Sequence, residues 1–114
     1  MDFSSLAKTL SLNLTLKLDH SNYFYWKTQV LTAIEALGLK GMVNETKRAP
    51  SKFLLIHYGD DSEQEENLKY VNWKKKDKLF MSWIFSTLTT SVLGQINGSK
   101  SSFEIWSKIE KTYS

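Results

Sequence analysis

Few residues in this 114-residue chain stand at spacings that support chemistry. His20 and His57 lie far apart in the sequence, and neither has a partner at a metal-ligand spacing such as H-E-x-x-H. Cysteine is absent, which excludes a thiol nucleophile, a disulfide and a cysteine-based zinc site. There is no G-x-S-x-G motif and no phosphate-binding glycine loop. The sequence therefore predicts that the chain is not an enzyme and that it takes no cofactor, metal or small-molecule substrate.

Asp77 is a carboxylate within an apolar stripe. It lies four residues after Trp73 and three before Phe80, so it shares a helix face with two large apolar side chains. An unpaired charge in such surroundings is costly. We therefore expect Asp77 to have a structural partner, through a salt bridge or a hydrogen bond to the end of a neighbouring helix, in preference to a catalytic role.

The lysine cluster Lys74, Lys75, Lys76 and Lys78 is the candidate nucleic-acid contact. Lysines bind phosphates, and the ring of the adjacent Trp73 could stack on a base. The competing interpretation is a solvated helix face with Trp73 buried. A net charge of only +3 is low for a dedicated nucleic-acid binder, so RNA is the weaker alternative.

Four helices are expected to position these residues. The stretch 66–88 is the longest with helical periodicity, and it is preceded by a helix that starts after Asn22 and ends at Gly38 and Gly41. A short helix over 88–96 follows, and the Ser101 and Glu104 capping box opens the last one. The predicted structural core consists of Tyr23, Trp26, Trp73, Asp77, Trp83, Ile84, Trp106 and Tyr113.

Two segments do not fit the helical pattern. Leucines alternate with polar residues over 12–18, which is typical of a half-buried strand that either lies across the helices or pairs with another chain. Residues 44–65 are expected to form a long loop, whose apolar run 53–58 docks on the core or faces a partner, docking being preferred. The candidate self-association residues are Leu12, Leu14, Leu16, Leu18, Phe53, Leu54, Leu55 and Ile56.

The composition limits which classes of protein this chain can belong to. Hydrophobic residues make up 41% of the chain and aromatic residues 13%, which predicts one folded domain over 12–114 behind a flexible tail at 1–11. No apolar run approaches the length of about 18 residues that a membrane span needs, and no signal peptide is evident. We therefore expect no membrane contact and an intracellular, cytoplasmic location.

In combination, these residues resemble the amino-terminal part of the Gag polyprotein of plant copia-type LTR retrotransposons. The resemblance covers about 14–114. This sequence departs from the family's pattern at His20, where the family commonly has glycine. The features that carry the resemblance are Leu18, Asn22, Tyr23 and Trp26 before and in the first helix, Trp73, Asp77, Trp83 and Ile84 in the long helix, and Trp106 and Tyr113 in the last.

The resemblance implies a mainly α, compact, capsid-lobe-like domain that assembles with itself or with other Gag chains, within a virus-like particle if the element is active. The second lobe and the RNA-binding zinc knuckle usual in the family do not lie within these residues. The leading hypothesis is thus a non-enzymatic assembly module and homo-oligomer. The alternatives are an RNA-binding module and a domesticated Gag fragment that interferes with particle assembly.

Overall fold

The fold is mainly helical, as the sequence predicts. The computed structural model describes residues 16–44 and 49–114, so the predicted tail and the candidates Leu12 and Leu14 lie outside the described residues. In chain order the elements are α2 (Tyr23–Ala36), α3 (Lys40–Val43), β1 (Phe53–Tyr58), β2 (Asp61–Glu66), α4 (Leu68–Ser86), α5 (Thr90–Gln95) and α6 (Ser102–Tyr113).

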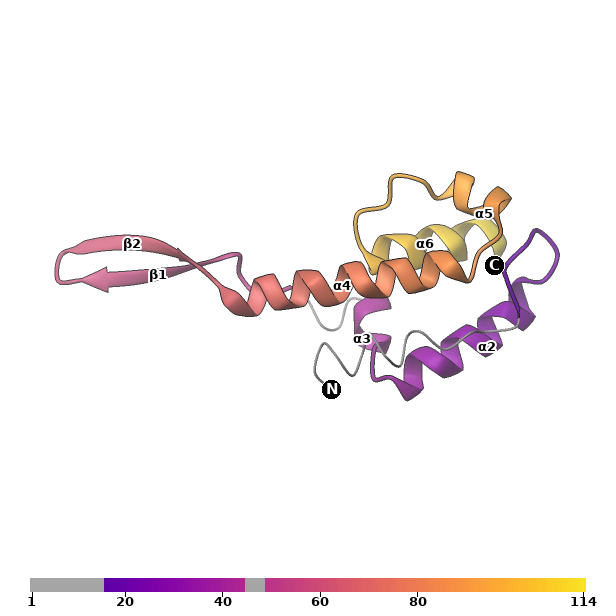
Figure 1. The fold of residues 1–114 in the computed structure, drawn as a ribbon, viewed down its shortest axis with the longest axis horizontal. Coiled ribbons are helices and arrows are strands. Elements are labelled where there is room, and N and C mark those ends of the chain that lie inside the picture. Colours follow the sequence, from indigo (N-terminus) through magenta and orange to yellow (C-terminus); the bar gives the residue numbers. More distant parts are fainter. Residues whose placement is uncertain (1–15, 45–48) are drawn as a thin grey trace.

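The helices α2, α3, α4 and α6 enclose the core (Figure 1). Helix α6 packs against both α4 and α3, and α3 packs against α2. Trp26 of α2, Phe80 of α4 and Ile109 of α6 are all fully buried. The rings of Trp26 and Trp106 lie 5.5 Å apart between centroids, which joins the first helix to the last.

Helix α3 was not expected from the sequence. Gly38 ends the run after α2 with a φ of 71°, in the left-handed region that favours glycine. Gly41, which we expected to act as a second terminator, is instead buried within α3. The helix is a single turn of four residues, too short to show the periodicity by which longer helices are found.

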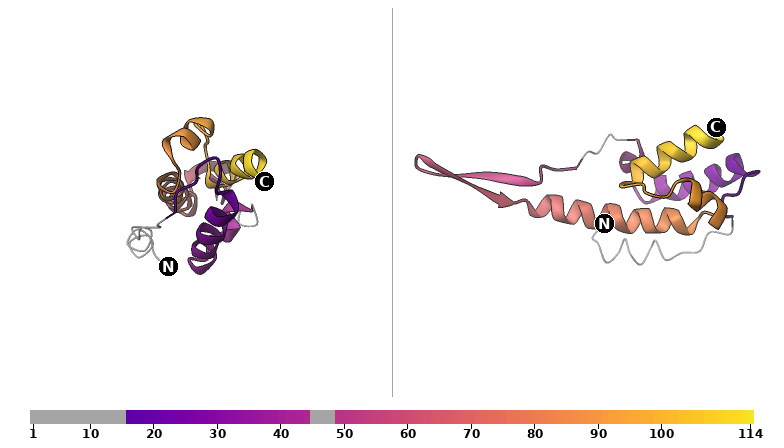
Figure 2. Two further views of the ribbon diagram at one scale, coloured as in Figure 1. Left: turned by 90° about the vertical axis from the view of Figure 1, so that its right-hand side faces the viewer. Right: turned by 90° about the horizontal axis from the view of Figure 1, so that it is seen from above.

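Residues 53–66 form an antiparallel β-hairpin where the sequence predicted a loop. Strand β1 pairs with β2 from Phe53 opposite Glu66 to Tyr58 opposite Asp61. The connection is the two-residue turn Gly59-Asp60, and Gly59 has a φ of 63°, as tight hairpin turns require. The hairpin projects beyond the amino-terminal end of α4, away from the other helices (Figures 1 and 2). The molecule consequently measures 61 × 28 × 22 Å, and only its helical part is compact.

Asn67 anchors the base of the hairpin to α4. Its side-chain oxygen accepts a hydrogen bond from the Lys69 N–H at 3.0 Å, which caps the helix. Its side-chain amide donates to the Ser51 carbonyl at 2.7 Å, and its backbone N–H donates to the Lys52 carbonyl at 3.1 Å. The chain therefore enters and leaves the hairpin at one fixed point.

The end of the leucine segment lies across its own helices. The Leu18 N–H donates to the Thr87 carbonyl at 2.8 Å, and the Leu18 carbonyl accepts from the Thr89 N–H at 3.0 Å. The Leu18 side chain is fully buried, and Leu16 is half-buried against the core. Of the two arrangements expected for this segment, the structure shows the intramolecular one at Leu18. Leu18 does not present a surface for self-association, because both its backbone and its side chain are occupied within the chain.

Candidate interaction surface

Strand β1 exposes a row of apolar side chains. Phe53, Leu54, Leu55 and Tyr58 are 48%, 47%, 59% and 60% exposed, and Ile56 is half-buried. The preferred expectation that this run docks on the core is therefore wrong. The backbone of β1 is paired with β2, and Asn67 holds the base of the hairpin at the amino-terminal end of α4. The side chains of β1 therefore cannot reach the interior. The other expectation, a surface that faces a partner, fits the structure.

One face of the hairpin combines apolar and acidic side chains. Residues directly opposite in an antiparallel pair point to the same side, and side chains alternate along each strand. The register thus places Leu54, Ile56 and Tyr58 on the same face as Glu65, Glu63 and Asp61. A hollow of about 240 Å³ on the hairpin is lined by Ile56, Tyr58, Glu63, Gln64 and Glu65. We call the three carboxylates Asp61, Glu63 and Glu65 the acidic row.

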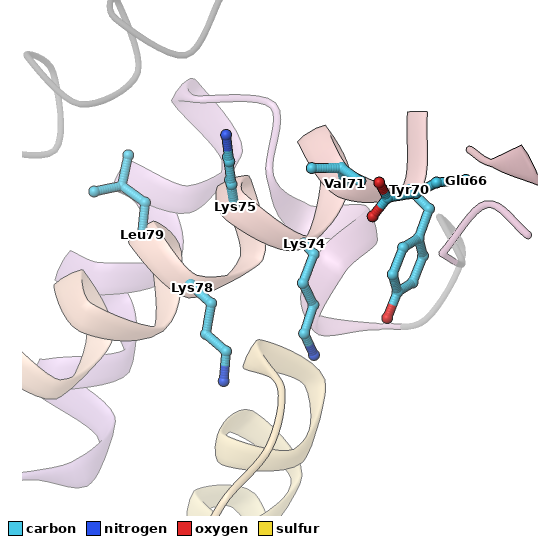
Figure 3. Close-up of a pocket in the computed structure, with 7 residues that line it drawn as sticks. All are labelled: Glu66, Tyr70, Val71, Lys74, Lys75, Lys78 and Leu79. Atoms are coloured by element: carbon cyan, nitrogen blue, oxygen red, sulfur yellow. The ribbon is translucent and has the colours of Figure 1, made fainter. Parts of the chain in front are cut away.

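A second surface feature is a groove of about 560 Å³ along the amino-terminal half of α4. Tyr70, Lys74 and Lys78 recur every four residues and extend to one side of the helix, whereas Lys75 and Leu79 extend to the other (Figure 3). We call this feature the lysine groove. Its lining is completed by Val71 and, at the hairpin end, by Glu66.

The lysine cluster is not a single surface. Lys74, Lys75 and Lys78 line the groove, while Lys76 is half-buried and outside it. Within the described ranges, no carboxylate lies within ion-pairing distance of these four ammonium groups; the ion pairs there are Lys40 with Glu35 and Lys108 with Glu104. The charges of the groove thus face solvent without a partner in this part of the chain.

Asp77 lies in the interior and holds the start of α6. It is 1% exposed, and its carboxylate accepts a hydrogen bond from the backbone N–H of Ser102, the first residue of that helix, at 3.1 Å. The Ser102 hydroxyl donates to the Asp77 carbonyl at 3.3 Å. A carboxylate at a helix amino terminus also interacts favourably with the helix dipole. The partner expected from the sequence, a neighbouring helix end, is the one that the structure shows.

The other predicted core residues divide into two groups. Tyr23, Trp26, Trp83, Ile84 and Trp106 are buried, whereas Trp73 and Tyr113 are half-buried against the core. Trp73 lies in the amino-terminal half of α4, toward the end of the helix that carries the hairpin. Its Nε1 is shielded from solvent and has no acceptor among the described residues.

The fold brings His20 to Ser91, a pairing that the sequence did not indicate. His20 Nε2 lies 2.7 Å from Ser91 Oγ, and His20 Nδ1 lies 3.3 Å from the Tyr113 hydroxyl, which donates to Gln95 Oε1 at 2.7 Å. A serine beside a histidine is a component of hydrolase sites, but here the third group is a phenol rather than a carboxylate. The arrangement is exposed and ties the turn before α2 to α5 and α6.

Local hydrogen bonds shift three pKa values. A hydrogen bond from the Ser21 backbone N–H lowers the pKa of Asp19. The pKa of Glu104 is lowered mainly by the backbone N–H of Lys100 and secondly by the side chain of Lys108. Burial raises the pKa of Tyr113. All three groups lie at turns or helix ends, away from the hairpin and the lysine groove, so these shifts reflect local structure.

The described residues contain neither a candidate metal site nor a candidate membrane-spanning helix. No three His, Asp or Glu side chains there gather closely enough to hold a metal ion. Over the same ranges, no helix combines the length and the apolar character that crossing a bilayer requires.

The fold and its surfaces thus describe a small helical domain that carries an exposed, apolar and acidic hairpin. The chain is 27% identical over 112 residues to two Arabidopsis thaliana proteins, the retrovirus-related Pol polyproteins from transposons RE1 and RE2. The similar region covers 95% of this chain and 7% of each polyprotein. No protein-family model and no solved structure matches the chain. The chain is thus similar to a short part of two plant transposon polyproteins.

Proposed function

We propose that this chain is a non-enzymatic assembly module from the Gag part of a copia-type retrotransposon polyprotein, and that it self-associates. The observation that carries the proposal is the exposed apolar row on β1, where Phe53, Leu54, Leu55 and Tyr58 stand in solvent on a hairpin that contributes no buried side chain to the core. Exposed apolar side chains gathered on one projecting element mark a contact site for another macromolecule.

The similarity to transposon polyproteins and the resemblance to Gag support a second copy as the partner. A Gag-type domain works by joining further copies of itself, and a two-stranded sheet has two unpaired edges that favour contact with other chains. In an active element this association takes place in the cytoplasm and leads to a virus-like particle. A domesticated fragment that interferes with assembly would use the same surface.

The test is to replace the apolar side chains by polar ones. Leu54→Ser with Leu55→Ser should lower the molar mass measured by light scattering at a given concentration, while the far-UV circular dichroism stays unchanged. Leu93→Ser, at a residue 37% exposed on α5, is the matched control and should associate as the parent does. A parent that remains monomeric at every concentration contradicts the proposal, as does a double variant that keeps the parent's mass.

RNA binding is the second candidate function. It is favoured by Lys74, Lys75 and Lys78, which line one groove and have no carboxylate partner among the described residues. Phosphate-driven binding weakens steeply as the salt concentration rises. Binding of a labelled single-stranded RNA to the parent, and loss of that binding in Lys74→Glu with Lys78→Glu, would support this second function. No binding at low salt would exclude it.

A further inference from the structure

The hairpin and the lysine groove are complementary in charge and in apolar character. The acidic row shares its face with Leu54, Ile56 and Tyr58, and the groove presents lysines beside Tyr70, Val71 and Leu79. Within the described parts of the chain, no ion pair involves the acidic row or the groove lysines. Each surface therefore holds neighbouring like charges that repel one another until an oppositely charged surface covers them.

The spacing of the charges also agrees. Alternate residues of a strand lie about 6.7 Å apart, so the Cα atoms of Glu63 and Glu65, whose side chains share one face, are separated by about that distance. Residues four apart on a helix are separated by about 6 Å along its axis, which applies to Lys74 and Lys78. Two carboxylates of the acidic row can therefore approach two groove lysines together.

The contact has to form between molecules. The hairpin leaves the amino-terminal end of α4 and projects away from that helix (Figure 1), whose amino-terminal half carries the groove. The Asn67 hydrogen bonds to Ser51 and Lys52 fix its base. Folding the hairpin back onto its own α4 would break these hydrogen bonds. A second molecule presents the same groove without that cost.

We propose that the acidic face of the hairpin of one copy docks in the lysine groove of a second copy. This inference rests on the proposed function and adds the identity of the two surfaces that meet. Exposed ion pairs contribute little energy each, so Leu54, Ile56 and Tyr58 supply most of the affinity and the charges select the partner surface and its register. The interface joins two different patches, so it closes a dimer by reciprocal exchange or continues into a longer assembly.

The experiment reverses the charge of each surface in the full chain. The hairpin variant carries Glu63→Lys and Glu65→Lys, and the groove variant carries Lys74→Glu and Lys78→Glu. Each variant alone then opposes like charges, and sedimentation should show association weakened roughly tenfold or more relative to the parent. A control with the same net charge as the groove variant, Lys17→Glu with Lys111→Glu, changes two exposed lysines outside both surfaces and should associate like the parent.

An equimolar mixture of the two variants is the decisive sample. The lysine-bearing hairpin of the first variant then meets the glutamate-bearing groove of the second, and the native hairpin of the second meets the native groove of the first. Association should recover to near the parent's level, with the two variants in equal amounts in the complex. Misfolding or general loss of solubility cannot produce this recovery.

Three results would overturn the inference for a parent that associates. The first is that the parent associates and that either charge-reversed variant, shown to be folded by circular dichroism, associates equally well. The proposed self-association would then be supported, but it would not use these two surfaces. The second is a mixture of two folded variants that does not recover. The third is parental association that ribonuclease abolishes, which would assign the groove to RNA. A monomeric parent contradicts both the inference and the proposed function.

If a charge-reversed variant is unfolded, the neutral replacements Glu63→Gln with Glu65→Gln and Lys74→Gln with Lys78→Gln take its place. These should each weaken association, and association at the parent's level would overturn the inference.

Discussion

At the scale of the residue, Trp26 on the apolar stripe of α2 and Trp73 on that of α4 differ in how deeply they are buried. Trp26 is fully buried, and its Nε1 donates to the Thr87 carbonyl at 3.0 Å and to the Thr87 hydroxyl at 3.2 Å. Trp73 is half-buried, and its Nε1 has no acceptor among the described residues. The two rings therefore contribute differently to stability, although their sequence patterns are alike.

We predict that Trp26→Ala lowers the free energy of unfolding by about 3 to 5 kcal/mol, as large-to-small core changes do. Trp73→Ala should cost less, about 1 to 2 kcal/mol, because less apolar surface is lost. Denaturant titrations followed by far-UV circular dichroism measure both. Equal losses for the two variants would contradict the difference in burial.

The Asp77 carboxylate acts within the core. Asp77→Asn keeps the size of the side chain but weakens the hydrogen bond from the Ser102 N–H and removes a charge from the start of α6. We predict a loss of about 1 to 3 kcal/mol in the free energy of unfolding. Asp61→Asn, at an exposed position of the hairpin, is the control and should leave the denaturation midpoint unchanged. A parental midpoint for Asp77→Asn would exclude a structural role.

Glu104 makes a pH-dependent contribution to the free energy of unfolding. Its pKa in the folded chain lies below the ordinary value of 4.5, because the Lys100 N–H and the Lys108 ammonium favour the carboxylate. As the pH falls, Glu104 is protonated first in the unfolded chain. The stabilisation is therefore complete above about pH 4.5 and is lost as the pH drops through the pKa of Glu104 in the folded chain. Glu104→Gln should flatten the fall of the denaturation midpoint in acid. Parallel curves for parent and variant would contradict this.

The sequence indicated the position of Asp77, left open whether Leu18 packs against its own helices, and did not indicate the exposure of Trp73. Asp77 could be placed because its neighbours at helical spacing are apolar, and its partner followed from the cost of burying a charge. Leu18 is enclosed by Thr87 and Thr89, which stand far along the chain, and no local pattern reports such a contact. The pairing of His20 with Ser91 was hidden for the same reason.

At the scale of the element, the longer helices were predictable and the hairpin was not. Their apolar periodicity and the Ser101 cap, whose hydroxyl accepts from the Glu104 N–H at 3.1 Å, locate them within a few residues. Strand β2 reads DSEQEE, which has neither β-branched residues nor alternation, so it gave no strand signal. The Gly59-Asp60 turn was the one local cue to a hairpin.

The hairpin should be separable from the helical core. All its side chains are exposed except Ile56, which is half-buried, and the Lys52 carbonyl and the Asn67 N–H already lie 3.1 Å apart at its base. We predict that replacing residues 53–66 with a short Gly-Ser-Gly turn leaves the helical circular dichroism and the cooperative thermal transition intact. Loss of cooperative unfolding would show that the hairpin supports the core.

At the scale of the whole molecule, a closed helical core and a projecting hairpin divide stability from interaction. The fully buried side chains of the core come from α2, α4, α5, α6 and the segments beside them, whereas the hairpin contributes none. The charges are divided in the same way, with acids on β2 and lysines on α4. This division predicts a molecule that folds as a monomer and carries an exposed apolar and acidic surface for contact with another molecule.

The central claim is that the hairpin drives self-association, and the most direct measurement compares the mass of the parent with that of the variant in which a Gly-Ser-Gly turn replaces residues 53–66. Sedimentation of both proteins over the same concentration series, after ribonuclease treatment, gives that comparison. We predict a mass that rises with concentration for the parent and a folded monomer throughout for the variant. A parent that stays monomeric, or a folded variant that associates as strongly as the parent, would contradict the claim.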